Sequence, residues 1–66
     1  MVNTQLIENL RMEHHYSQEQ IAKMLGYDSH AAYSRKIKGQ RQFTVEDVVA
    51  LCKIFQLELN ELIVMN

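Results

Sequence analysis

Residues 16–39 read YSQEQIAKMLGYDSHAAYSRKIKG, and they predict two short helices separated by a turn at Gly26. Ser17 and Gln20 have the spacing of a capping box, in which each side chain accepts a hydrogen bond from a backbone N–H at the start of a helix. Gly26 suits the left-handed conformation that ends many helices. The first helix of the pair is therefore expected at about residues 18–25.

The second helix of the pair is expected at about residues 29–38, and either Asp28 or Ser29 can cap it. Tyr33 and Ile37 lie four residues apart, which predicts that both face the core. The side chains expected to point away from the core are small, polar or cationic: His30, Ala31, Ser34, Arg35 and Lys38. A face with so little bulk allows close approach to base edges, whereas ordinary solvent-facing helices mix Glu with Lys.

Apolar residues at spacings of three and four predict further helices on both sides of this pair. In the N-terminal helix, Ile7 and Leu10 belong to a buried stripe, while Glu8 and Glu13 are expected to face outward. In the fourth helix, Cys52 lies on the apolar stripe and is expected to be a core residue rather than a nucleophile. The predicted helices cover about residues 4–14, 18–25, 29–38, 45–55 and 59–64.

The composition favours a single small all-α domain over residues 1–66. Hydrophobic residues make up 47% of the chain, and it contains no Pro and only two Gly, which suits helices joined by short turns. The single Cys cannot form an internal disulfide, so a reducing, cytoplasmic compartment is expected. Neither a signal peptide nor an apolar stretch long enough to span a membrane is recognisable, so no membrane association is expected.

Basic residues are concentrated in one part of the chain, although the net charge of the whole chain is -1. Residues 1–28 contain two basic and four acidic residues, and residues 42–66 contain one basic and four acidic residues. Between them, residues 29–41 contain four basic residues and no acid. Exposed charges more than about 8–10 Å apart are largely screened, so a phosphate group would respond to this local charge more than to the total. The alternative is a solvated loop that happens to be basic.

Residues suited to catalysis or metal binding are few and are not grouped. The chain has three His and one Cys, and none has the spacing to an acid or a second ligand that a nucleophile, an acid–base pair or a metal site requires. His14 and His15 are adjacent and project about 100° apart on a helix, with no third ligand nearby. No enzymatic activity, metal, cofactor or small-molecule ligand is therefore expected.

The order and spacing of these features resemble the XRE family, the helix-turn-helix regulators of the lambdoid phage repressor and Cro type. The resemblance spans nearly the whole chain and rests on the Ser17-Gln18 helix start, Ala22, Gly26, the basic loop with Gly39 and the turn at residues 59–62. It implies a compact five-helix, lambda-repressor-like domain that binds double-stranded DNA. It also implies that the protein is encoded by a bacterium or a phage and is associated with the nucleoid in the bacterial cytoplasm.

In that family the second helix crosses the DNA backbone, and the third helix enters the major groove. Carried over by position, the resemblance implies base-edge contacts by Ser29, His30, Ala31, Ser34 and Arg35. It implies phosphate contacts by Gln18, Lys36, Lys38, Gln40 and Arg41. Arg35 could read guanine through two hydrogen bonds or hold a phosphate, and both roles remain open.

The sequence departs from the family pattern in two places. The segment from Gly26 to Gly39 is one residue longer than the commonest family spacing, which leaves the register of the recognition helix open by one position. Family members also often pair an Arg at the position of Arg11 with a Glu shortly before the loop glycine. Here residues 36–38 read KIK, so this ion pair is either absent or made with another acid.

The predicted function is a sequence-specific DNA-binding transcriptional regulator, a repressor that binds a palindromic operator as a homodimer. The apolar C-terminal tail exceeds what a terminal helix needs for its own core, which predicts a dimer interface formed by Leu59, Leu62, Ile63, Val64 and Met65. The alternative is that Leu59 and Leu62 complete the monomer core while the last residues fray. The alternative function is a protein-interaction module, such as an antitoxin or an adaptor on the same fold.

Overall fold

The computed structural model describes residues 2–63, which form five α-helices and, outside them, one isolated β-bridge. The helices are α1 (Thr4–Glu13), α2 (Gln18–Met24), α3 (His30–Ile37), α4 (Val45–Phe55) and α5 (Leu59–Leu62). The first four lie within one residue of the predicted ranges. The fifth was predicted to run past Leu62, but α5 ends there because Ile63 is extended and forms the bridge with Val2. Within the described residues, none of these helices has the length and apolar character needed to cross a bilayer.

Side-chain caps hold the starts of three helices, α1, α2 and α4. The side chain of Asn3 accepts a hydrogen bond from the backbone of α1 at 3.0 Å. Ser17 and Gln20 make both bonds of a capping box at the start of α2, and Thr44 and Asp47 do the same for α4. These bonds satisfy backbone N–H groups that have no partner inside the helix, so local chemistry sets the three starts.

The turn between α2 and α3 passes through Gly26, and the residue that caps α3 is Ser29 rather than Asp28. Gly26 has a φ of 93°, a conformation that costs free energy for residues with a Cβ. Ser29 makes no side-chain capping bond, unlike Ser17, so its hydroxyl is not used by the start of α3.

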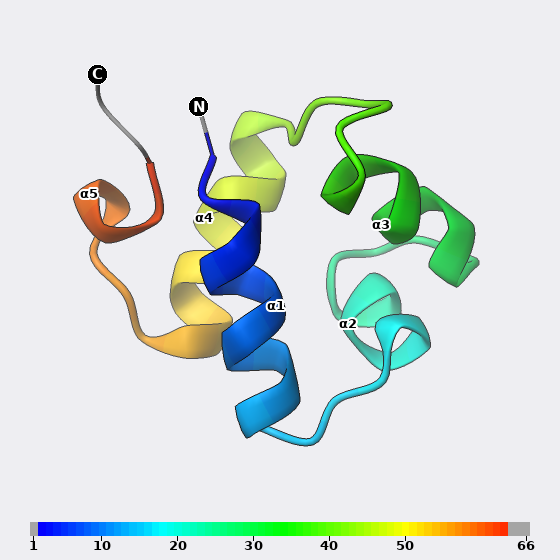
Figure 1. The fold of residues 1–66 in the computed structure, drawn as a ribbon, viewed down its shortest axis with the longest axis horizontal. Helices are drawn as coiled ribbons and strands as arrows, with labels where there is room; N and C mark the ends of the chain where they lie inside the picture. The colour runs from blue at the N-terminus through cyan, green and yellow to red at the C-terminus, as the bar shows by residue number, and fades with distance from the viewer. Residues whose placement is uncertain (1, 64–66) are drawn as a thin grey trace.

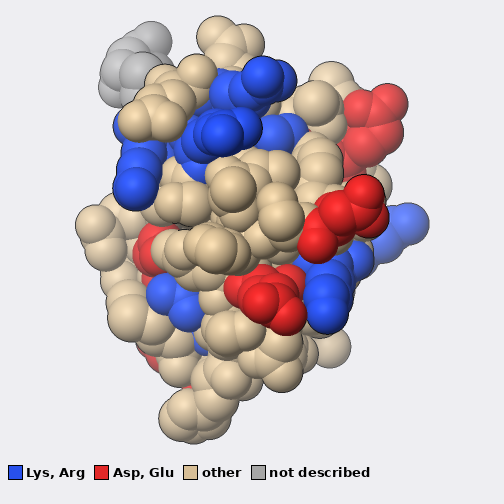
Figure 2. Space-filling model, turned by 90° about the vertical axis from the view of Figure 1, so that its right-hand side faces the viewer, with Lys and Arg blue, Asp and Glu red and all other residues tan. Residues whose placement is uncertain are grey.

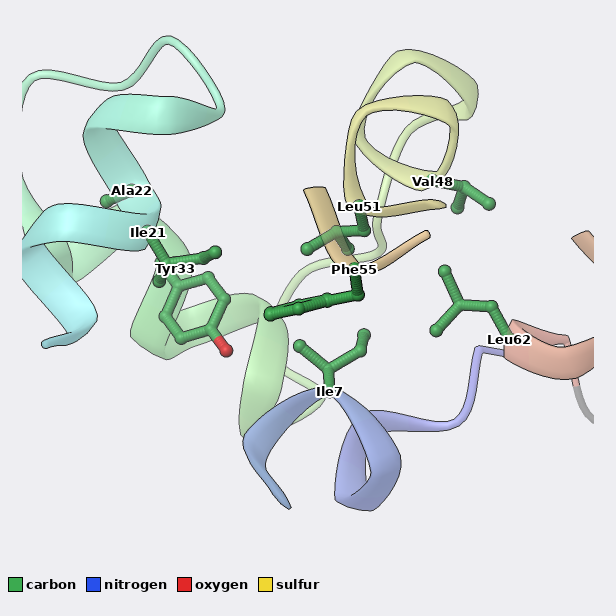
Figure 3. Packing of buried hydrophobic residues seen from close by; sticks show 8 residues of the cluster. All are labelled: Ile7, Ile21, Ala22, Tyr33, Val48, Leu51, Phe55 and Leu62. Carbon is green, nitrogen blue, oxygen red and sulfur yellow. The ribbon is translucent and has the colours of Figure 1, made fainter. Parts of the chain in front are cut away.

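Figure 1 shows α2 and α3 on one side of α1, and α4 and α5 on the other side. The helices meet in one core of eight buried residues contributed by all five: Ile7, Ile21, Ala22, Tyr33, Val48, Leu51, Phe55 and Leu62. Figure 3 shows the ring of Phe55 between Ile7 and Leu51, at the centre of this cluster. Ala22 is fully buried on α2, and its small side chain allows the close approach of α3.

The two ends of the described chain are joined next to α5. The backbone N–H of Asn3 donates to the carbonyl of Leu62 at 2.8 Å, and Val2 forms the β-bridge with Ile63. Because α5 is thus attached to α1 as well as packed on α4, Leu62 is completely buried within the monomer.

Candidate nucleic-acid interface

The outward face of α3 carries the residues that the sequence analysis assigned to base contacts. Ser29, His30 and Arg35 are exposed, and Ala31 and Ser34 are partly buried. Ser29 caps α3 and the other four residues lie on it, whereas Tyr33 and Lys36 of the same helix are buried. The face therefore presents short polar and apolar groups, with a single long cation near its C-terminal end.

An exposed basic patch, formed by Arg35, Lys38 and Arg41, adjoins this face. Figure 2 shows Lys and Arg atoms gathered at the top of the face, over the end of α3 and the loop that leads to α4. Asp or Glu atoms also stand at the upper right of this face, level with the patch, and the others lie lower, next to further Lys and Arg atoms. The folded surface thus keeps a cluster of basic side chains at one edge of this face, and a negatively charged backbone would be attracted to that edge.

Lys36 does not belong to this patch, and its predicted contact with a DNA phosphate is wrong. Its side chain is 7% exposed, and its ammonium group forms an ion pair with Asp47, which is 3% exposed. Helical geometry turns position 36 toward α4, whereas Lys38 lies in the following loop and faces solvent.

Lys36, Asp47 and Tyr27 form a buried polar cluster beneath the patch. The ammonium group donates to Asp47 and to the Tyr27 hydroxyl, and the hydroxyl donates to Asp47 at 2.7 Å. The same ammonium lies 4.7 Å from the centroid of the Tyr27 ring and 5.9 Å from that of Phe43. The cluster therefore joins the turn before α3, the last turn of α3 and the first turn of α4.

The loop after α3 folds back onto the end of that helix. The N–H groups of Gln40 and Arg41 donate to the carbonyl of Arg35 at 2.9 and 3.3 Å. Gly39 makes this return possible with a φ of 83°. The predicted phosphate contacts Lys38, Gln40 and Arg41 are exposed, and the loop keeps their backbone beside Arg35.

A second polar cluster centres on Glu8, which the sequence analysis wrongly placed on an outward face. Its carboxylate accepts hydrogen bonds from Arg11 at 2.7 Å, from the Tyr33 hydroxyl at 2.7 Å and from Gln18 at 3.3 Å. Arg11 also donates to the carbonyl of Tyr16 at 2.7 Å. Glu8 is thus the acid that replaces the missing family partner of Arg11, and it connects α1, α2 and α3.

The carboxyl groups of the partly buried Glu8 and the buried Asp47 both have a pKa below its ordinary value. Burial raises the pKa of Glu8, but hydrogen bonds from Arg11 and Tyr33 lower it by more in total. Burial likewise raises the pKa of Asp47, and its bonds with Lys36 and neighbouring donors reverse the effect. Burial and the adjacent carboxylate raise the pKa of the Tyr33 hydroxyl, which keeps it a hydrogen-bond donor.

These shifts predict a loss of stability in acid. The folded protein binds protons on Glu8 and Asp47 less readily than the unfolded chain, so their stabilisation is complete above the ordinary pKa values of 4.5 and 3.8. This stabilisation is lost as the pH falls below those values and then through the lower pKa values of the folded state. Urea unfolding at a series of pH values should show this fall, and Glu8→Gln should flatten it while Glu13→Gln should not. Equal stability of the wild-type protein on both sides of this window would contradict the prediction.

The partners in both polar clusters were not predicted from the sequence. The spacing of three residues between Glu8 and Arg11 on one helix was a usable signal, because side chains at that spacing are neighbours. Nothing comparable links Lys36 with Tyr27 or Asp47, which lie on other elements and meet it only in the fold.

The residues predicted for a dimer interface differ in their exposure to solvent. Leu59 is exposed, but Leu62 is completely buried and cannot contact a second chain, which corrects its predicted role. Ile63 is partly buried beside Val2, while Val64 and Met65 lie outside the described residues.

On α4, Val45 and Val49 add exposed apolar surface that was not predicted from the sequence. Cys52 lies between these surfaces, partly buried, and burial raises the pKa of its thiol, which suits a packing role.

One comparison with known proteins identifies a family whose model covers most of the chain. The model of the helix-turn-helix family matches residues 7–62, from the N-terminal core stripe to the end of α5. Searches of curated proteins and of solved structures gave no match. The matched region contains α2, the turn at Gly26, α3 and the scaffold around them. The chain therefore belongs to the XRE-type helix-turn-helix family and is a DNA-binding regulator.

Proposed function

We propose that the chain is a sequence-specific transcriptional repressor that binds a palindromic operator as a homodimer and excludes polymerase from it. The observation that carries the proposal is the exposed basic patch of Arg35, Lys38 and Arg41 beside the outward face of α3. Cationic side chains of this kind supply the sequence-independent part of DNA affinity, and the adjoining helix supplies the sequence-dependent part.

The proposed contacts follow from what each side chain can offer. Against base edges we propose Ser29, His30, Ala31, Ser34 and Arg35. Against phosphates we propose Gln18, Lys38, Gln40 and Arg41. The Ser29 hydroxyl is not used as a helix cap, and Arg35 is the one side chain of the base-contact set that can donate two hydrogen bonds to guanine.

Selection from a random duplex library tests this function directly. The wild-type protein is expected to enrich a palindrome with half-sites about 34 Å apart. Arg35→Ala is expected to relax one position in each half-site, at a cost of about 1–3 kcal/mol.

Lys38→Ala is the matched control for that selection, because it removes an exposed cation of the same patch. It should weaken binding to all duplexes alike and reduce the salt slope by about 1. Absence of any enriched sequence would overturn the proposed function. Binding to a protein partner without any affinity for DNA would instead favour an antitoxin or adaptor role.

The homodimer is proposed to form through α4 and Leu59 rather than through Leu62. Val45 is 77% exposed, Val49 is 44% exposed and Leu59 is 54% exposed, so these apolar side chains are open to solvent. A groove of about 250 Å³ beside them is lined by Val49, Cys52, Lys53, Leu57 and Leu59. An apolar partner surface would remove this area from water.

Val49→Asp is expected to produce monomers at concentrations at which the wild-type protein is dimeric, because dimer formation would bury an unpaired charge. Sedimentation velocity measures the change. Met24→Asp is the matched control, since Met24 is similarly exposed but lies on α2, and it should leave the dimer intact. A wild-type protein that stays monomeric at high concentration, both with and without operator DNA, would contradict the dimer.

A further inference from the structure

The loop of residues 38–44 is closed at its base by the buried ion pair of Lys36 and Asp47. Lys36 stands in the last turn of α3, and Asp47 stands in the first turn of α4. The loop between them carries the proposed phosphate contacts Lys38, Gln40 and Arg41. The position of these contacts relative to α3 therefore depends on how the two helix ends are held together.

The cluster restrains both ends of the loop and the turn before α3. On the α4 side, one Asp47 oxygen accepts from Lys36 and also from the Thr44 N–H at 2.9 Å. On the other side, Tyr27 bonds to both charged groups, so the turn that precedes α3 is attached to the same point. Three segments consequently meet at one ammonium group.

Stability alone does not require an ionic cluster at this place. Removing two charges from water is costly, and well-packed apolar residues can often replace a buried ion pair without loss of stability. A hydrogen-bonded ion pair differs in its geometric demand, because its strength depends on distance and angle. It therefore restricts the end of α3 and the following loop to one arrangement.

We propose that Lys36 and Asp47, assisted by Tyr27, are positioning residues for DNA recognition. They hold the loop against the end of α3, so that Arg35 reaches the bases while Lys38 and Arg41 reach the backbone in one register. The inference rests on the DNA contacts of the proposed function. It adds to them a buried ion pair, Lys36 with Asp47, that affects DNA recognition without touching DNA.

The test uses Lys36→Met/Asp47→Asn, which removes one charge of each sign and leaves the net charge unchanged. The amide introduced by Asp47→Asn can still accept from the Thr44 N–H and donate to the Tyr27 hydroxyl, so no buried polar group is left without a partner. Affinities for the selected operator and for a random duplex of equal length are measured at one salt concentration. We expect operator affinity to fall about tenfold, the scale of one mismatched base pair, with little change for the random duplex.

Amide hydrogen exchange provides a second readout that does not depend on DNA. The Gln40 and Arg41 amides, which bond to the Arg35 carbonyl, should exchange about tenfold faster in the variant, whereas core amides such as that of Leu51 should not. If the double variant does not fold, Tyr27→Phe serves for both measurements, because it removes only the bridging hydroxyl. We expect it to give smaller changes in the same directions.

Unchanged operator preference in a folded variant would overturn the inference, as would unchanged exchange at Gln40 and Arg41. A parallel loss of affinity for operator and random duplex, like that expected for Lys38→Ala, would also overturn it. If the wild-type protein prefers no duplex over another, the proposed function fails. The exchange data then decide only whether the cluster holds the loop.

Discussion

Asp47→Asn is expected to leave the chain largely unfolded at room temperature. The substitution keeps the shape of the side chain and its ability to accept from the Thr44 N–H, but it leaves the buried ammonium group of Lys36 without a counter-ion. Breaking a buried ion pair in this way costs about 3–5 kcal/mol. A core of this size rarely supplies more than about 3–5 kcal/mol in total, so the loss equals the whole stability of the domain. Thermal unfolding followed by circular dichroism measures it.

Two further variants test whether this loss of stability comes from the unpaired charge of Lys36. Glu46→Gln removes the neighbouring exposed acid from the same turn of α4 and should change the free energy of unfolding by less than about 0.5 kcal/mol. Lys36→Met/Asp47→Asn removes both charges and should restore a cooperative transition. An Asp47→Asn protein that melts at the wild-type temperature would show that leaving Lys36 without its counter-ion costs no stability.

Glu8→Ala should cause the second-largest loss, because one carboxylate serves three donors from three helices. The hydroxyl of the fully buried Tyr33 would be left without a partner, which costs about 1–3 kcal/mol. The bonds from Arg11 and Gln18 would be lost as well. In a domain this small, each kcal/mol lowers the thermal midpoint by about 4–8 °C.

Glu13→Ala is the matched control for Glu8→Ala, since it removes an exposed acid from the same helix. It should leave the midpoint nearly unchanged. Adding Tyr33→Phe to Glu8→Ala should recover part of the loss, because the unpaired hydroxyl is then absent. Equal midpoints for the Glu8 and Glu13 variants would rule out the proposed role of the carboxylate.

The helices and their ends were predictable because their signals are local. Ser17 with Gln20 and Thr44 with Asp47 act over three residues, and Gly26 acts through its own φ angle. Likewise, the concentration of basic residues in 29–41 is a property of a continuous segment, so it is visible before folding. Tyr33 was assigned to the core correctly because the spacing of apolar positions on one helix reports its buried side.

The sequence by itself thus determined the five helices, the turn that separates α2 from α3, and the place of the basic patch. Only the tertiary structure decided which cations and acids of those segments face solvent. Lys36 and Lys38 are two residues apart and equivalent in charge, yet one is buried against Asp47 and the other is exposed. Glu8 similarly became the partner of Tyr33, 25 residues away. Such pairings depend on the angles at which helices pack, and these angles are set by the whole core rather than by the few residues around each charge.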